Sequence, residues 1–572
     1  MKVELERITT EQFLARRSHI VFVIWTVIVL AIPVWWKTTE VYRAPLPFDA
    51  IRSWETAEAL TVKLSMNIHL CFGAKVVEKL SPTSLSTVAT LTQMELAEIF
   101  AEAVPAHSDV RQVSLMFEVD SIVGPNAWEA SVMSPQEFDA GLGNTHGDNG
   151  VYYVYIDCAV AALTGKESVY IGKNRAIFLN MHQMCTRDSV VSRAVSVLSG
   201  LFGREQLSLS KLYKEKAADD MDRKSMRVVK YAPTYQVMLS LLIGNPEDTI
   251  VSWDIHTAAE AYIQSFLAEL GTISDFTISS QILNYASLPI KPESYNNSNG
   301  STEYHMSPKS LSNFVNSVEW NLASVVSSAS PIHMILYIPP FEQTPLFVLH
   351  SDGSTLESNA FLIPQWGGVV IRNLPTDTHR VHLSMDDLHP VMEIFVEQLR
   401  GLLGMDRTQI MNEHILLPGV TVQYAAAPEL GVTLWELDRL FRGRTLQNIV
   451  NAAQTLTSLA NLLEQLSGMV VLDLIKDLVT NSLWSLTKAK HELQNRQFIK
   501  AAHHACEAVA TAEAAFFHPS MVPLLYFPDE HKFAIYMPYF VPVAVPLIMA
   551  LIREVRLRIK ARGLGGIKTK TA

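Results

Sequence analysis

"IVFVIWTVIVLAIPVWW", from Ile20 to Trp36, holds no charged side chain over 17 residues. A helix of about this length is at the lower limit for crossing the hydrocarbon core of a bilayer. A cleaved secretory signal is the alternative, but such signals end in small residues, whereas this run ends in Pro33, a valine and two tryptophans. The sequence therefore predicts a retained transmembrane helix at residues 20–36.

The residues beside and within this helix predict its orientation. Arg16 and Arg17 precede it, and cytoplasmic flanks of membrane helices are enriched in Lys and Arg. Trp35 and Trp36 fit the aromatic belt at the opposite membrane surface, and Trp25 adds to the aromatic surface of the span. We expect the amino terminus in the cytoplasm and the three tryptophans in contact with the membrane or a neighbouring protein.

A second run near the carboxyl terminus, "FAIYMPYFVPVAVPLIMALI", has 20 residues without a charge and is interrupted by Pro538, Pro542 and Pro546. Prolines at this density break a soluble helix, but membranes tolerate them where neighbouring helices satisfy the freed carbonyls. The run therefore predicts a second span, 533–552, with protein contacts at its prolines. Packing of the two spans on each other explains the prolines as well, and a buried core segment is the alternative to a span.

The charge distribution supports a division of the chain by the membrane. The first 19 residues carry four basic and three acidic side chains, and the tail from Arg553 carries one acidic side chain, Glu554. The formal charge of −11 therefore leaves −18 for the segment between the spans, which is a poor partner for nucleic acid. The tail is expected to be cytoplasmic because of its seven basic residues, Arg553, Arg556, Arg558, Lys560, Arg562, Lys568 and Lys570.

The segment after the first span has the pattern of a mixed α/β domain. Apolar and polar residues alternate over 62–70 and 113–119, as in half-buried strands, and 91–104 has a helical pattern. Residues 151–156 form a continuous apolar run, as in a strand covered on both faces. This order of strand, helix and strand predicts sheet layers covered by helices.

The same order returns after Tyr231. Strands are expected at 235–243, 276–283 and 331–340, with a helix over 255–270. Gly271 follows that helix, where a left-handed terminus is favoured.

Beyond Met385 apolar residues recur at helical spacing, and 482–517 is rich in alanine. The fold class expected is a lumenal α/β domain with a helical carboxy-terminal part, flanked by a transmembrane helix at each end. The predicted parts are cytoplasmic residues 1–19, span 20–36, α/β region 37–380, helical region 385–520, span 533–552 and cytoplasmic tail 553–572.

Four cysteines are too few for a disulfide-built scaffold. Cys71, Cys158, Cys185 and Cys506 allow three complete pairings; a Cys158–Cys185 bridge is one interpretation, and buried free thiols at these positions are the alternative. Two glycosylation sequons begin at Asn296 and Asn299, inside a Ser/Asn-rich stretch typical of an exposed loop. Their use would place this stretch outside the cytoplasm.

No motif predicts a catalytic, cofactor or metal site. The adjacent His503 and His504 are not expected to reach one ion from a single helical face. The same segment places His503 three positions before Cys506, but catalytic thiol–imidazole pairs usually come from separate elements. In "NAFLIPQWGGVVIRNLP", Trp366 with Gly367 and Gly368 favours a structural corner over a binding groove.

Three strings resemble one known family. "WWKTTEVYRAPLP" (35–47) resembles the stretch after the first span of the PIG-S family, the membrane-hairpin subunit of the glycosylphosphatidylinositol (GPI) transamidase. "FLIPQWGGVVIRN" (361–373) is similar to the family's central string, and "AFFHPSMVPLLYFPDEHKFAIYMPYFVPVAVP" (515–546) to its entry into the second span. The resemblance covers nearly the whole chain in the same order.

The resemblance implies a non-catalytic subunit in the endoplasmic-reticulum membrane, with two spans, a large lumenal domain and cytoplasmic termini. Its complex attaches GPI anchors to the carboxyl end of precursor proteins. The implied partners are the other subunits, including a cysteine-protease-like catalytic one, and membrane lipids, and the implied role is scaffolding. A membrane-tethered lumenal enzyme, or a cargo-binding receptor, acting on GPI lipid or proteins is the alternative.

Overall fold

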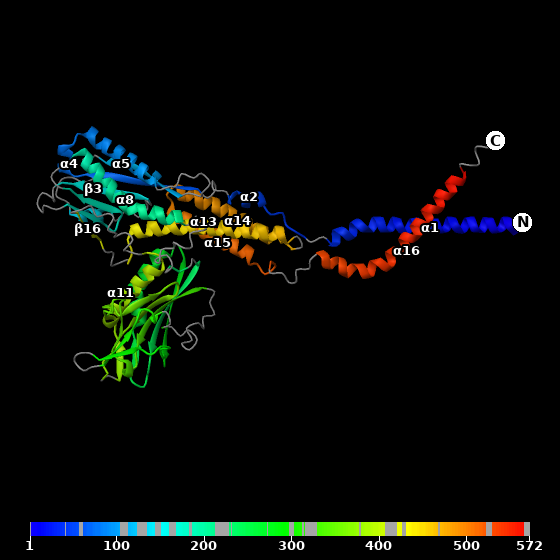
Figure 1. Cartoon of the computed structure of the whole chain (residues 1–572). Coiled ribbons are helices and arrows are strands. Elements are labelled where there is room, and N and C mark those ends of the chain that lie inside the picture. Colours follow the sequence, from blue (N-terminus) through cyan, green and yellow to red (C-terminus); the bar gives the residue numbers. More distant parts are fainter. Residues whose placement is uncertain are drawn as a thin grey trace. The chain divides into compact units, whose positions relative to one another are not determined.

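The chain, a computed structural model, divides into two compact units (Figure 1). One unit comprises residues 1–48, 456–480 and 513–572, and the other residues 49–455 and 481–512. The structure describes residues 2–39, 42–55, 61–102, 113–122, 134–142, 150–158, 167–181, 186–211, 228–229, 232–271, 273–296, 302–311, 314, 329–376, 379–405, 420–425, 431–466, 469–521 and 529–565.

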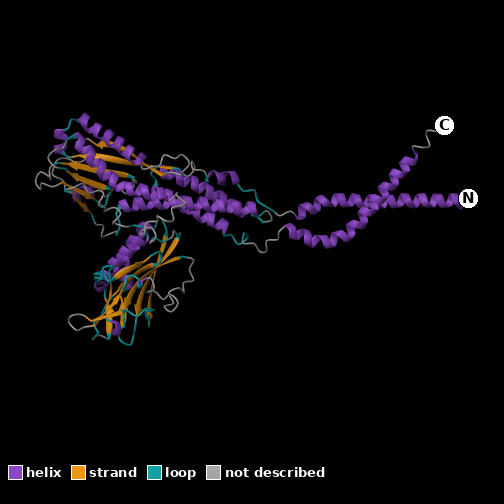
Figure 2. Ribbon diagram, in the orientation of Figure 1, coloured by secondary structure: helices purple, strands orange, loops and turns teal. Residues whose placement is uncertain are grey.

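The larger unit contains two main sheets (Figure 2). The first has four neighbouring parallel strands, then an antiparallel strand, then a strand parallel to that one. In spatial order its strands are β2 (Val113–Ile122), β1 (Val62–Phe72), β3 (Val151–Asp157), β5 (Ala176–Asn180), β4 (Glu167–Ile171) and β16 (Val420–Tyr424).

The predicted alternation on β1 is confirmed. Its even-numbered residues Val62 to Leu70 are all buried, and the residues between them are exposed or half-buried. This apolar face has the spacing of a strand covered on one side, and helix α5 (Pro82–Glu102) packs against the neighbouring β2 and against α8 (Arg187–Lys211). Helix α5 begins nine residues before the predicted start at Leu91; residues 103–104 lie outside the described part.

The second sheet repeats the design with a different strand order. Its four parallel strands carry one antiparallel edge strand. In spatial order they are β13 (Ala360–Ile363), β14 (Gly367–Ile371), β11 (Ser330–Ile338), β6 (Thr234–Ile243) and β8 (Asp275–Asn284). The strands predicted at 235–243, 276–283 and 331–340 are therefore confirmed to within two residues.

The predicted helix at 255–270 is present as three consecutive segments, α9 (Ile255–Ala258), the π-helical η3 (Ala259–Gln264) and α10 (Ser265–Leu270). The prediction of a left-handed terminus at Gly271 is wrong, because its φ is −59°. Its N–H instead donates to the carbonyl of Ala268 at 3.1 Å, which closes the helix with a tighter turn. Helix α11 (Met385–Leu402) packs beside these segments and on β14.

Two small sheets complete this region. One has strands β12 (Leu346–Val348), β10 (Thr302–Met306) and β9 (Glu293–Asn296), and the other β15 (Arg380–Leu383) and β7 (Ile250–Trp253). Buried side chains of β10, β12, β6, β11 and β14 share one core, whose members include Met306, Leu346, Leu242, Tyr337 and Val369.

Three long helices follow, as predicted from the spacing: α13 (Leu434–Gln465), α14 (Asp473–Gln494) and α15 (Phe498–Phe516). The alanines of α15 permit close packing: Ala501, Ala505, Ala508 and Ala512 are fully buried, and the Ser482 hydroxyl donates to the Ala508 carbonyl at 2.8 Å. The strand β16 lies inside the segment expected to be helical, where it extends the first sheet.

Among the shorter helical segments, α2 (Phe48–Ser53), α4 (Ala74–Lys79) and α6 (Pro135–Gly141) lie in the amino-terminal half, and the 3-10 turn η5 (Phe341–Gln343) lies in the second half. The smaller unit holds the two terminal helices, α1 (Lys2–Thr39) and α16 (Asp529–Gly565).

Candidate functional site

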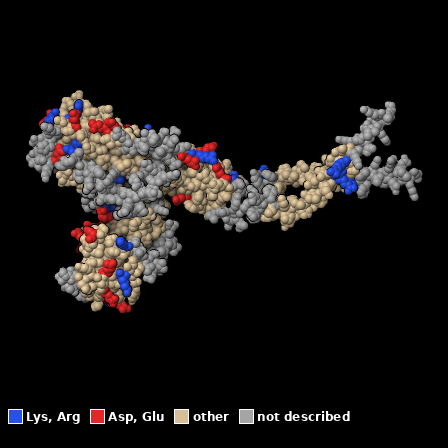
Figure 3. All heavy atoms as spheres, viewed as in Figure 1, with Lys and Arg blue, Asp and Glu red and all other residues tan. Residues whose placement is uncertain are grey.

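Helices α1 and α16 contain the two predicted spans. Residues 16–35 and 534–557 are long and apolar enough to cross a membrane, and neither stretch is buried inside the protein. Figure 3 shows these helices as an almost uncharged surface with Lys and Arg side chains gathered toward one end. The exposure contradicts the alternative that the second run is a buried core segment.

The two spans contact each other at two places. At one end, the ring of Trp35 makes edge contacts with Tyr536 and Phe540, with centroids 5.9 and 6.1 Å apart. At the other end, the Arg17 guanidinium donates to the Glu554 carboxylate at 2.9 Å. An aromatic contact at one interface and an ion pair beside the other are the arrangement expected of an antiparallel hairpin.

Other predicted contact residues lie elsewhere on these helices. Trp25 is half-buried, and its indole N–H has no hydrogen-bond partner among the described atoms, whereas the side chain of Trp36 lies outside the described part. Pro538, Pro542 and Pro546 are all exposed, although α16 continues through them as a helix. Each proline lacks the N–H that would bond the carbonyl four residues earlier, so three carbonyls lie one turn apart without a helical partner.

Residues 42–44, which follow the first predicted span, form hydrogen bonds with the end of α13 and with the segment that leads into α14. Tyr42 donates its hydroxyl to the Asp473 carboxylate at 2.9 Å, and the Arg43 guanidinium donates to the carbonyl of Leu463 near the end of α13 at 2.7 Å. The backbone of Ala44 donates to Val471 at 2.9 Å. The hydrogen bond to Asp473 raises the pKa of Tyr42 above its ordinary value, with small further contributions from burial and charge.

The three cysteines that the structure describes are a buried thiol, a thiol in hydrogen bonds and a disulfide-bonded residue. Cys506 donates its thiol to the carbonyl of Ile273 at 3.3 Å and accepts a hydrogen bond from Asn448 at 3.5 Å, contacts that fix α15 to its surroundings. Cys71 is a free thiol whose pKa is raised to about 12 by burial, so it carries no thiolate at neutral pH. Cys158 is disulfide-bonded, and its candidate partner Cys185 lies outside the described residues.

Three side chains on α15 lie closer together than the sequence predicted. The ligand atoms of His503, His504 and Glu507 are within 4.8 Å of one another, so neighbouring histidines do converge here. His504 nevertheless packs edge-on against Trp484 and lies 3.5 Å from Glu507, and His503 and Glu507 are exposed. A surface group of three ligands on a single helix has too little enclosure to define a metal centre by itself.

The central string around Trp366 is a structural corner, as predicted. A Cβ atom at Gly367 would lie 2.0 Å from the carbonyl oxygen of His333, and one at Gly368 would lie 2.0 Å from the Gln398 side chain. Both glycines therefore allow β14 to approach β11 and α11 closely. Trp366 stacks on the buried His333 ring at 4.5 Å, and burial lowers the pKa of that histidine to about 4.

Buried ion pairs that no short motif indicated join α13 to the first sheet and to helix α8. Arg175 donates two hydrogen bonds to the Asp438 carboxylate, at 2.6 and 2.7 Å. Arg442 donates two to the Glu205 carboxylate, at 2.6 and 2.8 Å. The Tyr152 hydroxyl joins the two pairs, since it donates to Asp438 at 3.0 Å and accepts from Arg442 at 2.8 Å.

Electrostatics keep this network charged. Burial opposes the charge of Arg442, but the attraction and hydrogen bonds of Glu205, together with the attraction of Tyr152 and Asp438, outweigh it and hold the pKa of the guanidinium above its ordinary value. Burial raises the pKa of Tyr152, so its hydroxyl keeps its proton. Every carboxylate oxygen of Asp438 and Glu205 accepts a hydrogen bond from an arginine. This is expected of a buried network that stabilises the fold and not of a reactive centre.

A third buried arginine carries the same kind of contact into the second sheet region. Arg400 on α11 pairs with Glu436 in the first turn of α13 and with the carbonyl of Gly431. Glu436 also accepts the N–H of Thr433 at 2.9 Å, which caps α13. The sequence signal for these contacts was the charge-rich start of α13, "WELDRLFR", in an otherwise apolar helix.

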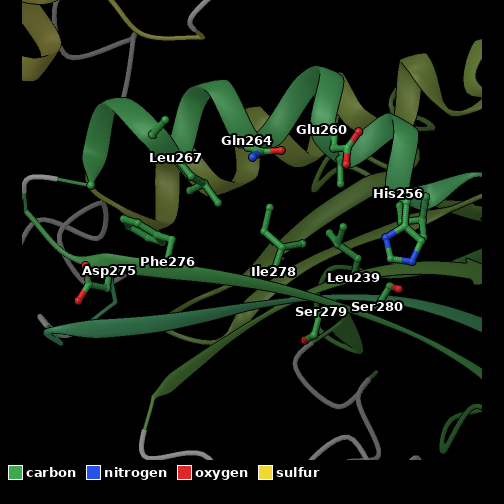
Figure 4. A pocket seen from close by; sticks show the side chains of 14 residues that line it. Leu239, His256, Glu260, Gln264, Leu267, Asp275, Phe276, Ile278, Ser279 and Ser280 are labelled. Atoms are coloured by element: carbon green, nitrogen blue, oxygen red, sulfur yellow. The ribbon is translucent and has the colours of Figure 1, made fainter.

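A groove of about 560 Å³ lies between β8 and the helix formed by α9, η3 and α10 (Figure 4). His256, Glu260 and Gln264 line it from the helix at intervals of one turn, and Phe276 and Ile278 line it from the strand. The groove was not predicted. Its sequence signal is the row of exposed polar residues every fourth position on the helix, facing a strand whose residues are mostly exposed.

The sequon residue that the structure describes is exposed. Asn296 ends β9, and its amide oxygen accepts a hydrogen bond from the Thr302 hydroxyl at 3.2 Å. Asn299 lies outside the described residues.

These features define an α/β protein with two terminal helices that are long and apolar enough to span a membrane, whose described residues bring together no nucleophile, base and oxyanion site. A profile of the family "Phosphatidylinositol-glycan biosynthesis class S protein" matches residues 22–561. The chain belongs to this family, PIG-S, as its three strings predicted.

Curated relatives agree along nearly the full length. The "GPI-anchor transamidase component PIGS" of Homo sapiens is 32% identical over 544 residues, and that of Bos taurus 32% over 541; each alignment covers 92% of both chains. The "GPI transamidase component PIG-S homolog" of Schizosaccharomyces pombe is 29% identical over 339 residues, which is 59% of this chain and 56% of the relative. The relatives' names support a role in the GPI transamidase and designate a component of that complex.

Proposed function

We propose that this chain is a non-catalytic subunit of the GPI transamidase, which supports the attachment of GPI anchors by holding the other subunits together. The observation that carries the proposal is the match to named transamidase components over 92% of both chains. The chemistry of the described cysteines agrees with it, because one thiol is disulfide-bonded, one is buried and protonated, and Cys506 is engaged with a backbone carbonyl. A different, cysteine-protease-like subunit supplies the nucleophile in this proposal.

The same proposal places residues between the spans in the lumen of the endoplasmic reticulum and both termini in the cytoplasm. The disulfide at Cys158 supports an oxidising compartment, and the basic residues beside both spans support cytoplasmic ends. Glycosylation at Asn296 or Asn299 tests the sidedness. Glycosidase treatment of the membrane-derived chain should increase its mobility, and replacement of both asparagines by glutamine should abolish that change. An unchanged mobility together with protease sensitivity from the cytoplasmic side would place the domain on the wrong side.

The membrane part of the scaffold is the proline-bearing face of α16 together with the tryptophans of α1. Among the described side chains of α1 and α16, the half-buried ones lie within Arg17–Ile28 and Ala544–Glu554. Outside these two ranges the helices touch through the contact of Trp35 with Tyr536 and Phe540. Within the described spans, α1 therefore leaves Pro538 and Pro542 uncovered, and their unbonded carbonyls favour a helix of another subunit that offers hydroxyl or amide donors.

This membrane contact is tested by replacing Pro538, Pro542 and Pro546 with leucine. Restored helix carbonyl bonds and lost kinks should reduce the amount of other subunits that co-purify from gently solubilised membranes. Replacement of Val541, Val543 and Val545 with leucine is the matched control, because it changes volume on the same segment and leaves the backbone bonds alone. Undiminished association of the proline variant would remove the membrane interface from the proposal.

The role in anchoring is tested in cells that lack the chain. Surface GPI-anchored proteins should fall and unprocessed precursor should accumulate, and the full chain should restore both. The double variant Cys71→Ser with Cys506→Ala should also restore anchoring if it is present at normal abundance. Normal anchoring in the cells that lack the chain would overturn the assignment, and failure of that variant at normal abundance would overturn the non-catalytic role.

A further inference from the structure

The groove beside β8 continues into an exposed strand edge. Strand β8 has ten residues, and its ladder is formed with β6 alone among the described strands. Ile278 and Ile282 are 38% and 45% exposed, which is unusual for isoleucines in the middle of a long strand. The groove and the edge therefore form one surface, which we call the β8 surface: the groove lining together with Phe276, Ile278, Ser280 and Ile282.

The backbone pattern identifies the groups on the open side. Asp275 donates its N–H to the carbonyl of Pro233 at 2.9 Å, so the odd-numbered residues of β8 face β6. Because backbone groups alternate sides along a strand, the N–H and C=O groups of Phe276, Ile278, Ser280 and Ile282 point away from the sheet. No described residue bonds to them. Eight backbone groups on one line are a template for a further strand.

The edge strand of the first sheet, β2, is partly closed by side-chain amides. Gln206 accepts the N–H of Leu115 at 3.0 Å and donates to the carbonyl of Val113, and Gln93 accepts the N–H of Val119 at 3.4 Å. The open edge of β8 thus differs from the β2 edge of the same molecule, where two glutamines bond part of the outward-facing backbone.

The charges along the groove indicate what it binds. Glu260 and Asp275 line it, and none of the lining residues that the structure describes is Lys or Arg. Gln264 and Ser280 add neutral hydrogen-bonding groups. A ligand that runs along this surface is therefore favoured when it offers backbone groups to β8 and at least one Lys or Arg side chain to the groove.

We propose that the β8 surface binds an extended segment of another transamidase subunit, which adds a strand to β8 and places a basic side chain in the groove. This inference rests on the proposed function, because it takes the partner from the same complex. A permanent subunit fits better than a transient substrate, because a ten-residue edge with exposed isoleucines favours self-association whenever it is empty. Strand addition satisfies the open backbone groups and covers both isoleucines at once.

The proposal is tested first by amide hydrogen exchange of the chain alone and in the complex purified from membranes. The N–H groups of Ile278, Ser280 and Ile282 should exchange at least about tenfold more slowly in the complex, because a new strand bonds them. Those of Thr277, Ser279 and Gln281 are already bonded to β6 and should change little. If the complex contains its other subunits and the outward-facing amides exchange as in the free chain, the β8 proposal is overturned while the proposed function stands.

Substitutions then identify the contacts. Ser280→Pro removes one outward-facing N–H without touching the ladder to β6, and Ser280→Ala is the matched control that keeps it. Glu260→Lys with Asp275→Lys reverses the charge of the groove, and the control is Glu247→Lys, an exposed residue outside it. Ser280→Pro and the charge-reversed variant should each lower protection of β8 at least about fivefold, whereas both controls keep it; equal behaviour of variants and controls contradicts the proposal.

A photo-reactive residue at Ile282 reports the occupant. In the assembled complex it should cross-link to one other subunit, and the linked peptide should contain Lys or Arg. A cross-link to a precursor protein, or to a second copy of this chain, would overturn the proposed occupant. A chain that never co-purifies with other subunits would instead refute the proposed function itself, so the two failures are distinguishable.

Discussion

The edge strands β2 and β8 are both ten residues long and both pair in parallel with a single central strand, but they end their sheets differently. Helices α5 and α8 cover β2 and extend Gln93 and Gln206 to its open backbone groups. Beside β8, the helix of α9, η3 and α10 leaves a groove of about 560 Å³. Similar α/β construction therefore yields one edge whose outward-facing backbone groups are partly bonded by side chains of the same chain, and one edge whose outward-facing groups no described residue bonds.

The same contrast extends to the way each sheet region buries polar groups. The first sheet region holds Arg175 and Arg442 in paired, two-fold hydrogen bonds with carboxylates. In the centre of the second sheet, the Nδ1 atom of His333 is buried without a hydrogen-bond partner among the described atoms. Paired charges make a region intolerant of losing one partner, whereas a buried neutral histidine makes a region sensitive to acid.

The largest expected effect is the loss of Arg442. Arg442→Ala leaves the carboxylate of Glu205 buried without its partner and removes the donor to Tyr152, so the free energy of unfolding should fall by about 3–5 kcal/mol. Denaturant unfolding of the purified chain in detergent measures it. Arg187→Ala on the same helix as Glu205 is the control, because its pair with Asp188 is largely exposed and contributes less than about 1 kcal/mol. Equal losses in the free energy of unfolding for the two variants would contradict the stabilising role of this buried network.

Acid should weaken the second sheet through His333. Burial lowers the pKa of this histidine to about 4, whereas in the unfolded chain it is near 6.5, so below pH 6.5 only the unfolded chain takes up the proton. The free energy of unfolding that neutral His333 contributes is fully present above pH 6.5. It falls by about 3 kcal/mol between pH 6.5 and pH 4.

The measurement compares the wild type with His333→Gln, unfolded in denaturant at pH 7 and at pH 4.5. The variant should lose less stability over this interval, because glutamine does not titrate. Parallel losses in the two proteins would show that His333 does not cause the acid sensitivity.

Opening the closed edge should cost less. Gln206→Leu leaves the N–H of Leu115 and the carbonyl of Val113 unbonded, which lowers the free energy of unfolding by about 1–3 kcal/mol. Amide exchange at Leu115 should accelerate in parallel. Gln264→Leu in the exposed groove is the matched control and should change stability by less than about 0.5 kcal/mol. If Gln206→Leu leaves the free energy of unfolding unchanged, the glutamine does not close the edge.

The smallest effect on stability is expected on the open edge. Ile282→Thr replaces a side chain that is 45% exposed, so the free energy of unfolding should change by about 0.5 kcal/mol or less. Leu115→Thr on β2, where the side chain is 4% exposed, should cost about 2 kcal/mol or more. Light scattering of the chain purified alone should show less self-association for Ile282→Thr. An increase would contradict the proposed role of the edge.

The local sequence predicted most of the elements because periodicity is a short-range property. Alternation over 62–70 and the apolar run at 151–156 gave strands that the structure contains, and the spans were predicted from length and charge alone. The left-handed terminus at Gly271 was wrong because the choice between two helix endings depends on small differences in backbone geometry. The corner at Gly367 and Gly368 was predicted, but its cause, the carbonyl of His333 and the side chain of Gln398, lies outside the string.

The sequence by itself predicted two helices apolar enough to span a membrane, several of the strands and helices between them and, through three strings, the family. Only the tertiary structure decided which surfaces are complete. Arg175 and Asp438 are 263 positions apart, and Arg442 and Glu205 are 237 apart, so no local pattern could pair them. Periodicity shows that one face of a strand is buried, but the groups at its edge are satisfied or left open by helices from elsewhere in the chain. The difference between β2 and β8 is for that reason a property of the fold.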